Sequence, residues 1–156
     1  MRDQCFWMLG AAASLWEHVP SPSQGAMILV VERDPHVQML ERYFLEQAGY
    51  SVELVDNGRA ALARARELRP CILISEILVP ELDGLAVCRA IKATQETRHI
   101  AVLIFSILSA EGRAREAGAD AFLRKPLDDA LLIGSVETLL HRYEKAEEDE
   151  RPSGTR

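Results

Sequence analysis

Short apolar runs alternate with longer amphipathic segments from Met27 almost to the end of the chain. Five of these runs have the length and apolar content of strands: 27–31, 52–55, 71–75, 100–105 and 121–123. The third run is continuously apolar, which indicates a central strand. Strands that alternate with helical segments are typical of a parallel sheet covered by helices on both faces. The pattern therefore predicts an α/β domain with five parallel strands.

Apolar residues at helical spacing predict a helix after each strand. In the first helix, four such residues are expected to face the core: Val37, Leu40, Phe44 and Ala48. A second helix follows Asn57-Gly58, a third covers 84–93, a short fourth lies near 110–117, and the last begins after Pro126. Each helix is long enough to cover part of one sheet face except the fourth. The fourth helix is predicted to be short.

The chain divides into three parts by composition. Residues 1–26 form an N-terminal extension that ends in the Pro/Ser-rich joint 20–25, and we expect it to be flexible. A secretory signal is the alternative for this extension, but Arg2 is its only early basic residue and small residues interrupt its apolar stretch. Residues 27–143 form the predicted domain. Residues 144–156 carry no apolar stripe, which predicts a charged, disordered tail.

Charge and cysteine content narrow the function classes. With 24 acidic and 18 basic residues the chain has a net charge of −6, and its basic residues form no cluster for nucleic acid. No run approaches the roughly 20 apolar residues of a membrane-spanning helix. Three cysteines without a CxxC pair fit a reducing cytoplasm. Neither nucleic acid nor a membrane is therefore expected as a partner. The sequence contains no nucleotide-binding or catalytic-triad motif, so we expect a protein that is not an enzyme.

A set of residues at strand ends, turns and helix ends indicates a more specific fold family. In chain order the set is Ile28-Leu29-Val30-Val31 with Pro35, Asn57-Gly58 with Ala61-Leu62, Pro70, Pro80 with Asp83-Gly84, Ala117-Gly118-Ala119-Asp120, and Lys125-Pro126. Together these residues resemble the response-regulator receiver family over residues 27–143. The resemblance implies a flavodoxin-like, doubly wound sheet in the order 2-1-3-4-5, with its site at the carboxyl ends of strands one and three. The segment between Ser106 and Lys125 is shorter than usual for the family, so we expect the fourth helix to be truncated or shifted.

The resemblance also assigns positions in the receiver pocket. Receivers accept a phosphoryl group on an aspartate after strand three, and here Glu76 occupies that position. The acidic positions after strand one correspond to Glu32, Arg33 and Asp34, and the switch and phosphate-contact positions to Ser106, Phe122 and Lys125. Asp83 is expected to be a turn or cap residue. The pocket therefore keeps its helper residues and has altered residues where metal and phosphate would bind.

The altered residues change the charge of the pocket. If Arg33 and Lys125 both face Glu32 and Glu76, the charges cancel without a metal, and the guanidinium would repel Mg²⁺. Two interpretations remain open for Glu76. It could stand in for a phosphorylated aspartate through hydrogen bonds to Ser106 and Lys125, or Arg33 could hold it in an inactive-like ion pair.

The sequence thus predicts a stand-alone atypical receiver that signals through protein contacts and needs neither aspartyl phosphorylation nor a cofactor. Its expected partners are a sensor kinase or a downstream effector, and a homodimer could form through the face of helix four, strand five and helix five. The alternative is a phosphorylatable single-domain response regulator. In that case Glu76 or a neighbouring acidic residue would accept the phosphoryl group, and Glu32 and Asp34 would hold Mg²⁺.

Overall fold

A computed structural model describes residues 25–150 of the chain. Its elements are β1 (Met27–Val31), α1 (Pro35–Gln47), β2 (Ser51–Val55), α2 (Gly58–Leu68), β3 (Ile72–Ser75), α3 (Gly84–Ala93), β4 (Ala101–Ser106), α4 (Glu111–Glu116), β5 (Ala121–Arg124) and α5 (Asp129–Asp149). Every predicted strand and helix is present, with ends that differ by one or two residues in most cases. The truncated fourth helix is confirmed, since α4 has 6 residues.

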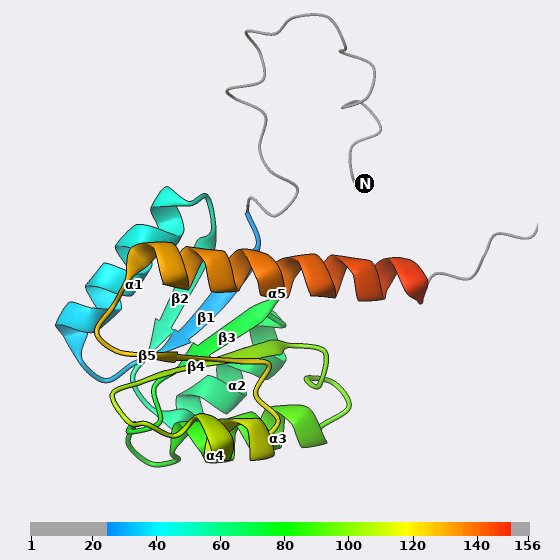
Figure 1. Cartoon of the computed structure of the whole chain (residues 1–156). Helices are drawn as coiled ribbons and strands as arrows, with labels where there is room; N and C mark the ends of the chain where they lie inside the picture. The colour runs from blue at the N-terminus through cyan, green and yellow to red at the C-terminus, as the bar shows by residue number, and fades with distance from the viewer. Residues whose placement is uncertain (1–24, 151–156) are drawn as a thin grey trace, which may run out of the picture.

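The five strands form one parallel sheet in the order β2-β1-β3-β4-β5, as predicted. Figure 1 shows α1 and α5 on one face of this sheet and α2, α3 and α4 on the other. Strands β1 and β3 lie in the interior of the sheet, and their side chains are almost all buried on both faces. This is the burial expected of a doubly wound sheet.

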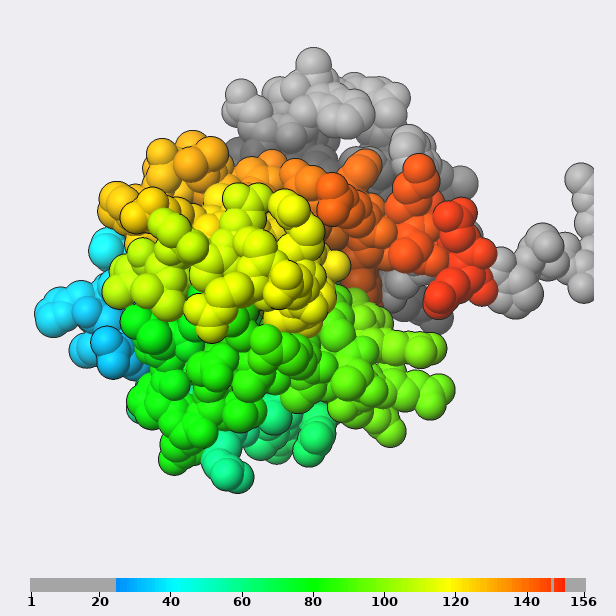
Figure 2. All heavy atoms as spheres, turned by 60° about the horizontal axis from the view of Figure 1, so that its bottom comes forward, coloured from blue at the N-terminus to red at the C-terminus, as the bar shows by residue number. Residues whose placement is uncertain are grey.

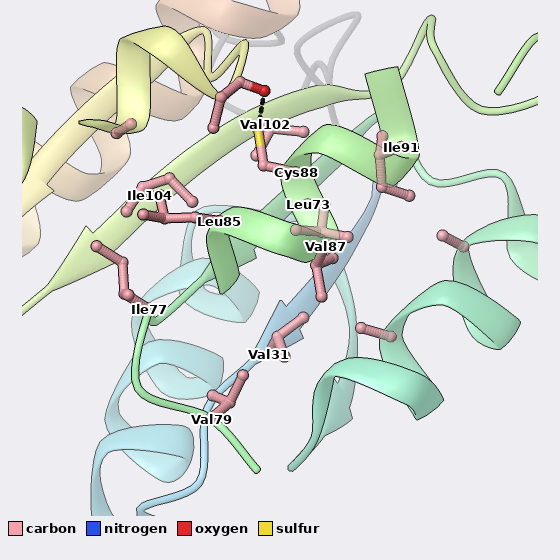
Figure 3. Packing of buried hydrophobic residues seen from close by; sticks show 14 of the residues in the cluster. Val31, Leu73, Ile77, Val79, Leu85, Val87, Cys88, Ile91, Val102 and Ile104 are labelled. Atoms are coloured by element: carbon pink, nitrogen blue, oxygen red, sulfur yellow. Dashed lines mark hydrogen bonds between the residues drawn. The ribbon is translucent and has the colours of Figure 1, made fainter. Parts of the chain in front are cut away.

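Each face of the sheet has its own hydrophobic core. On the α2–α4 face, residues of β1, β3 and β4 pack against α3, whose buried positions include Leu85, Cys88 and Ile91 (Figure 3). The Cys88 thiol is hydrogen-bonded to the carbonyl oxygen of Ala117, and burial raises its pKa to about 11. Within residues 25–150, neither Cys88 nor the half-buried Cys71 forms a disulfide.

The second core lies under α1 and α5, and it corrects the predicted inward face of α1. Leu40 was expected to face the core, but it is 48% exposed, and Tyr43 beside it is also exposed. The buried positions of α1 are instead Glu41 and Leu45. The helix is rotated relative to its apolar stripe, because Leu45 packs with residues of β1, β3 and α5 while Leu40 points outward.

The C-terminal part of the chain also differs from the prediction. Helix α5 continues to Asp149, through the first six residues of the predicted disordered tail. These residues include Glu144, Lys145 and Ala146, which favour helix by intrinsic propensity even without a packed face. Figure 2 shows the end of α5, in red, at the periphery of the molecule. The predicted extension lies outside the described residues except for Gly25 and Ala26. Among residues 25–150, no helix is long and apolar enough to cross a membrane.

Candidate functional site

The carboxyl ends of four neighbouring strands bring four polar side chains together. Glu32 directly follows β1, Glu76 follows β3, Ser106 ends β4, and Lys125 follows β5. Backbone hydrogen bonds keep the ends in register, with Glu76 N donating to Val31 O at 3.0 Å and Lys125 N donating to Ser106 O at 2.9 Å. Parallel strands thus place residues from four distant parts of the chain at one sheet edge.

Glu76 is the most highly hydrogen-bonded side chain of this site. Its Oε1 accepts from the Ser106 hydroxyl and from the backbone amides of Ile77 at 2.6 Å and Leu78 at 3.3 Å. Its Oε2 accepts from the Ile107 amide at 3.2 Å and pairs with Lys125 Nζ at 2.9 Å. Both oxygens of this buried carboxylate are therefore occupied by donors from the ends of β3, β4 and β5.

Lys125 bridges the two buried carboxylates. Its Nζ lies 2.5 Å from Glu32 Oε2 and 2.9 Å from Glu76 Oε2, and the two carboxylate side chains are only 3% and 4% exposed. The ammonium also lies 5.5 Å from the centre of the Phe105 ring, within the range of a cation–π contact. One cation thus serves two buried anions, which makes Lys125 the electrostatic centre of the site.

The protonation states follow from these contacts. Burial alone would raise the pKa of Glu76, but the hydrogen bonds from Ser106 and Lys125 and the charge of Lys125 hold the pKa below its ordinary value. Burial would lower the pKa of Lys125, but hydrogen bonds and attraction from Glu32 and Glu76 raise it instead. Both groups are therefore charged at neutral pH, and each stabilises the charged form of the other.

The structure does not place Arg33 in this site. Arg33 is exposed, and Glu76 is paired with Lys125. The predicted Arg33–Glu76 ion pair is therefore wrong, and so is the expectation that Arg33 balances the pocket charge. The physical reason is the direction of the chain after β1: Glu32 turns inward to Lys125, and the next residue faces solvent.

Asp34 has a structural task at the start of α1. Its Oδ1 accepts hydrogen bonds from the amides of His36 at 2.8 Å and Val37 at 3.3 Å, so it is the N-cap of the helix. These amide bonds hold the pKa of Asp34 below its ordinary value. Its own amide donates to Glu32 Oε1 at 2.8 Å, which fixes the orientation of Glu32. Asp34 thus orients the Glu32 carboxylate while its own side chain caps α1.

The observed donor set does not fit a divalent cation. A hard cation such as Mg²⁺ needs several free oxygen ligands at octahedral positions. Here Lys125 Nζ lies between the Glu32 and Glu76 carboxylates, and the remaining oxygens of both accept amide or hydroxyl hydrogen bonds. Within residues 25–150, no three Asp, Glu, His or Cys side chains are grouped as a metal site.

The other predicted positions have simpler surroundings. The Ser106 hydroxyl is buried and also accepts a hydrogen bond from the Leu108 amide at 3.1 Å. Phe122 is half-buried and packs against the α2–α4 core. Asp83 is confirmed as a cap, because its Oδ1 accepts from the amides of Leu85 and Ala86 at the start of α3.

Sequence reasoning missed one charged residue near the site. Glu41 of α1 is 1% exposed, and the charges of Glu32, Glu76 and Lys125 all act on it. A glutamate in a helix is usually solvated, so its residue type gave no reason to expect Glu41 in the core. The available signal was its spacing, since Glu41 lies four residues after Val37 and four before Leu45.

The chain is similar to many known signalling proteins. Residues 28–137 match the model of the response regulator receiver domain. The response regulator PleD of Caulobacter vibrioides is 36% identical over 118 residues, which cover 73% of this chain and 26% of PleD. The polar-differentiation response regulator DivK of Brucella anthropi is 34% identical over 116 residues, which cover 72% of this chain and 94% of DivK. The chain thus spans about a quarter of PleD and nearly all of DivK.

Solved structures agree with this similarity. The signal receiver domain of a signal transduction histidine kinase from Syntrophus aciditrophicus has 36% identity and a TM-score of 0.72, over 85% of this chain and 98% of that chain. A putative response regulator from Chloroflexus aurantiacus has 28% identity and a TM-score of 0.73, over 76% and 99% of the two chains. Fold, site position and sequence agree, and the chain belongs to the response regulator receiver domain family.

Proposed function

We propose that this chain is an atypical receiver that signals through protein contacts, with a pocket whose conformation does not depend on aspartyl phosphorylation. The membership of the chain in the receiver family supports a role in two-component signal transduction. The finer proposal depends on a single observation, the hydrogen-bonding of Glu76.

The hydrogen-bond donors placed to bind a phosphoryl group at the end of β3 are already bonded to the Glu76 carboxylate. Ser106, the Ile107 amide and Lys125 all bond it directly. Glutamate is one methylene longer than aspartate, so its carboxylate reaches these donors without an added group. A nucleophile displaced by about 1 Å can lose on the order of a hundredfold in rate. Glu76 therefore stands in for a phosphorylated aspartate and holds an active-like pocket.

The pocket residues also argue against a cation-dependent mechanism. Lys125 neutralises part of the charge of Glu32 and Glu76 from within the site, and Asp34 is committed to capping α1. The proposed protein needs no metal or other cofactor and is not an enzyme. It acts in the cytoplasm, and neither nucleic acid nor membrane is its direct partner.

The proposed partners are proteins, either a sensor kinase or a downstream effector. The face of α4, β5 and α5 supports this proposal, because β5 is an edge strand and Leu131 at the start of α5 is 60% exposed. Leu131 and Gly134 line a groove beside β5 in which an apolar side chain of a partner could pack. A second copy of the chain could use the same face as a homodimer.

The alternative, a phosphorylatable receiver, draws support from one similar structure. The receiver domain of the sensor histidine kinase PA1611 from Pseudomonas aeruginosa has a magnesium ion coordinated in its active-site cleft. It is 27% identical to this chain, with a TM-score of 0.66 over 76% of this chain and 97% of that chain. In this chain, the corresponding role would require Glu32 and Asp34 to leave their present hydrogen bonds.

Incubation with acetyl phosphate and Mg²⁺ separates the two proposals. Because both Glu76 oxygens are occupied, intact-mass spectrometry is expected to detect no phosphoryl adduct on the full chain. Light scattering is expected to give the same molar mass with and without the donor. A receiver with aspartate after its third strand serves as the positive control. A stoichiometric adduct, or a donor-dependent change of mass, would establish the phosphorylatable receiver instead.

A further inference from the structure

Glu41 is a buried acid that the proposed function leaves unused. It lies on the inward face of α1, one turn before Leu45, and is 1% exposed. Its Oε2 is buried and has no hydrogen-bond partner among the described residues. A buried carboxylate without a partner is strongly disfavoured, whereas a neutral carboxylic acid is tolerated far better. The environment of Glu41 therefore favours the protonated form.

The charged groups around Glu41 act in the same direction overall. Glu32, at the end of β1, and Glu76, at the end of β3, both oppose a further negative charge, and only Lys125 favours it. Lys125 is already shared by the other two carboxylates. On α1 itself, Arg42 is directed elsewhere, to Glu46 at 3.5 Å and to the Val52 carbonyl oxygen. Burial, followed by the charge of Glu32, raises the pKa of Glu41 to about 8.

We propose that Glu41 is a proton-binding site coupled to the Lys125 bridge, so that loss of its proton weakens the pocket. The ionised Glu41 would be a third carboxylate competing for the one ammonium that holds Glu32 and Glu76. The pocket is then intact while Glu41 is neutral and loosens as pH rises. This proposal concerns the charge balance of the pocket and holds whether or not the protein is ever phosphorylated.

The sign of the pH effect distinguishes Glu41 from Glu76. The folded protein raises the pKa of Glu41 above the ordinary 4.5, so this stabilisation is complete below pH 4.5 and is lost as pH rises toward about 8. The pKa of Glu76 is lowered, so its stabilisation is present above pH 4.5 and is lost in acid. Of these two carboxyl groups, Glu41 alone therefore makes the fold less stable as pH rises from 5 to 8.

Urea unfolding of the full chain between about pH 5 and pH 8 tests this proposal through three proteins: the natural chain, Glu41→Gln and Glu46→Gln. Glutamine is neutral at all pH values and close to protonated glutamate in shape. The folding equilibrium constant of the natural chain, divided by that of Glu41→Gln, is expected to fall about tenfold per pH unit. Glu46→Gln changes an exposed glutamate of the same helix and is expected to follow the natural chain. Parallel profiles for the natural chain and Glu41→Gln would overturn the proposal.

A direct titration covers the case in which Glu41→Gln does not fold. Carbon-13 NMR of the glutamate carboxyl groups in the natural chain is expected to give Glu41 a midpoint well above those of the exposed glutamates. The amide signal of Ile107, which donates to Glu76, is expected to move with the same midpoint. An ordinary midpoint for Glu41 would refute the proton site, and an Ile107 signal that ignores the Glu41 titration would refute its coupling to the pocket.

Discussion

Lys125→Met is expected to destabilise the folded protein by about 3–5 kcal/mol at neutral pH, because it leaves two buried carboxylates without their counter-charge. Glu32 and Glu76 are 3% and 4% exposed and share this single ammonium. Methionine retains an unbranched apolar side chain of similar length, so packing against Phe105 is largely kept. The free energy of unfolding, measured by urea denaturation of the natural chain and the variant, gives the loss directly.

A second lysine of the chain supplies the matched control. Lys92 pairs with Asp120 at 2.8 Å, as close as the Lys125–Glu76 pair, but the two side chains are 24% and 36% exposed. Partly exposed pairs contribute little, so Lys92→Met is expected to cost about 1 kcal/mol. If the two lysine variants lost the same free energy of unfolding, the buried Lys125 bridge would contribute no more to stability than a partly exposed ion pair. That result would contradict the role assigned to Lys125 in the site.

Gly84→Ala is expected to destabilise the protein by about 3 kcal/mol, because the added methyl group would overlap backbone atoms. A Cβ at Gly84 would lie 2.2 Å from the carbonyl oxygen of Glu76 and 2.9 Å from Ser75 Oγ. The start of α3 therefore packs directly against the segment that carries Glu76, and the Gly84 amide donates to Ile77 O at 2.9 Å. Moving this helix would also displace the Ile77 and Leu78 amides that bond the Glu76 side chain.

Gly134→Ala provides the control for this prediction. Gly134 lies within α5 and is exposed, and a Cβ there would meet no atom within 4 Å. Alanine is favoured over glycine inside a helix by about 1 kcal/mol, so this variant is expected to be slightly more stable than the natural chain. Thermal or urea unfolding of both glycine variants measures the contrast. A Gly84→Ala protein as stable as the natural chain would show that α3 is not held against the Glu76 segment.

The fold was predictable because its signals are local and repeated. Strand β1, for example, is a continuous apolar run whose observed bounds, Met27–Val31, equal the predicted ones. Asn57 and Asp83 cap α2 and α3 through their own side chains, so the residue type at the helix start carried the information. The family resemblance then supplied the strand order, which hydrophobic patterning alone does not determine.

The sequence predicted most of the residues of the site but not the directions in which their side chains point. Glu32, Arg33 and Asp34 are consecutive, and the sequence does not encode which of them turns inward once the strand has ended. The structure directs Glu32 to Lys125, Asp34 to the helix cap and Arg33 to solvent. The sequence analysis did not single out Glu41, because a charged side chain is usually exposed, whereas here the neighbouring elements bury it.

These positions change how the pocket balances its charge. The Glu32 and Glu76 carboxyl groups share one ammonium, and burial raises the pKa of a third carboxyl group, that of Glu41, to about 8. Lys125 therefore performs alone the neutralisation that had been expected from two basic residues. The occupied Glu76 carboxylate follows from this arrangement, since the lysine and the ends of β3 and β4 converge on it.

A Mg²⁺ titration followed by backbone amide NMR tests most directly whether the Glu76 carboxylate is already fully engaged. The amides of Leu78 and Ile107 report on its two oxygens, because each donates to one of them. The natural chain is expected to show no saturable shift of either signal, because donors already occupy both Glu76 oxygens, whereas a receiver with aspartate after its third strand is expected to show one. Saturable magnesium-dependent shifts of both amides in the natural chain would contradict the proposed metal-free pocket.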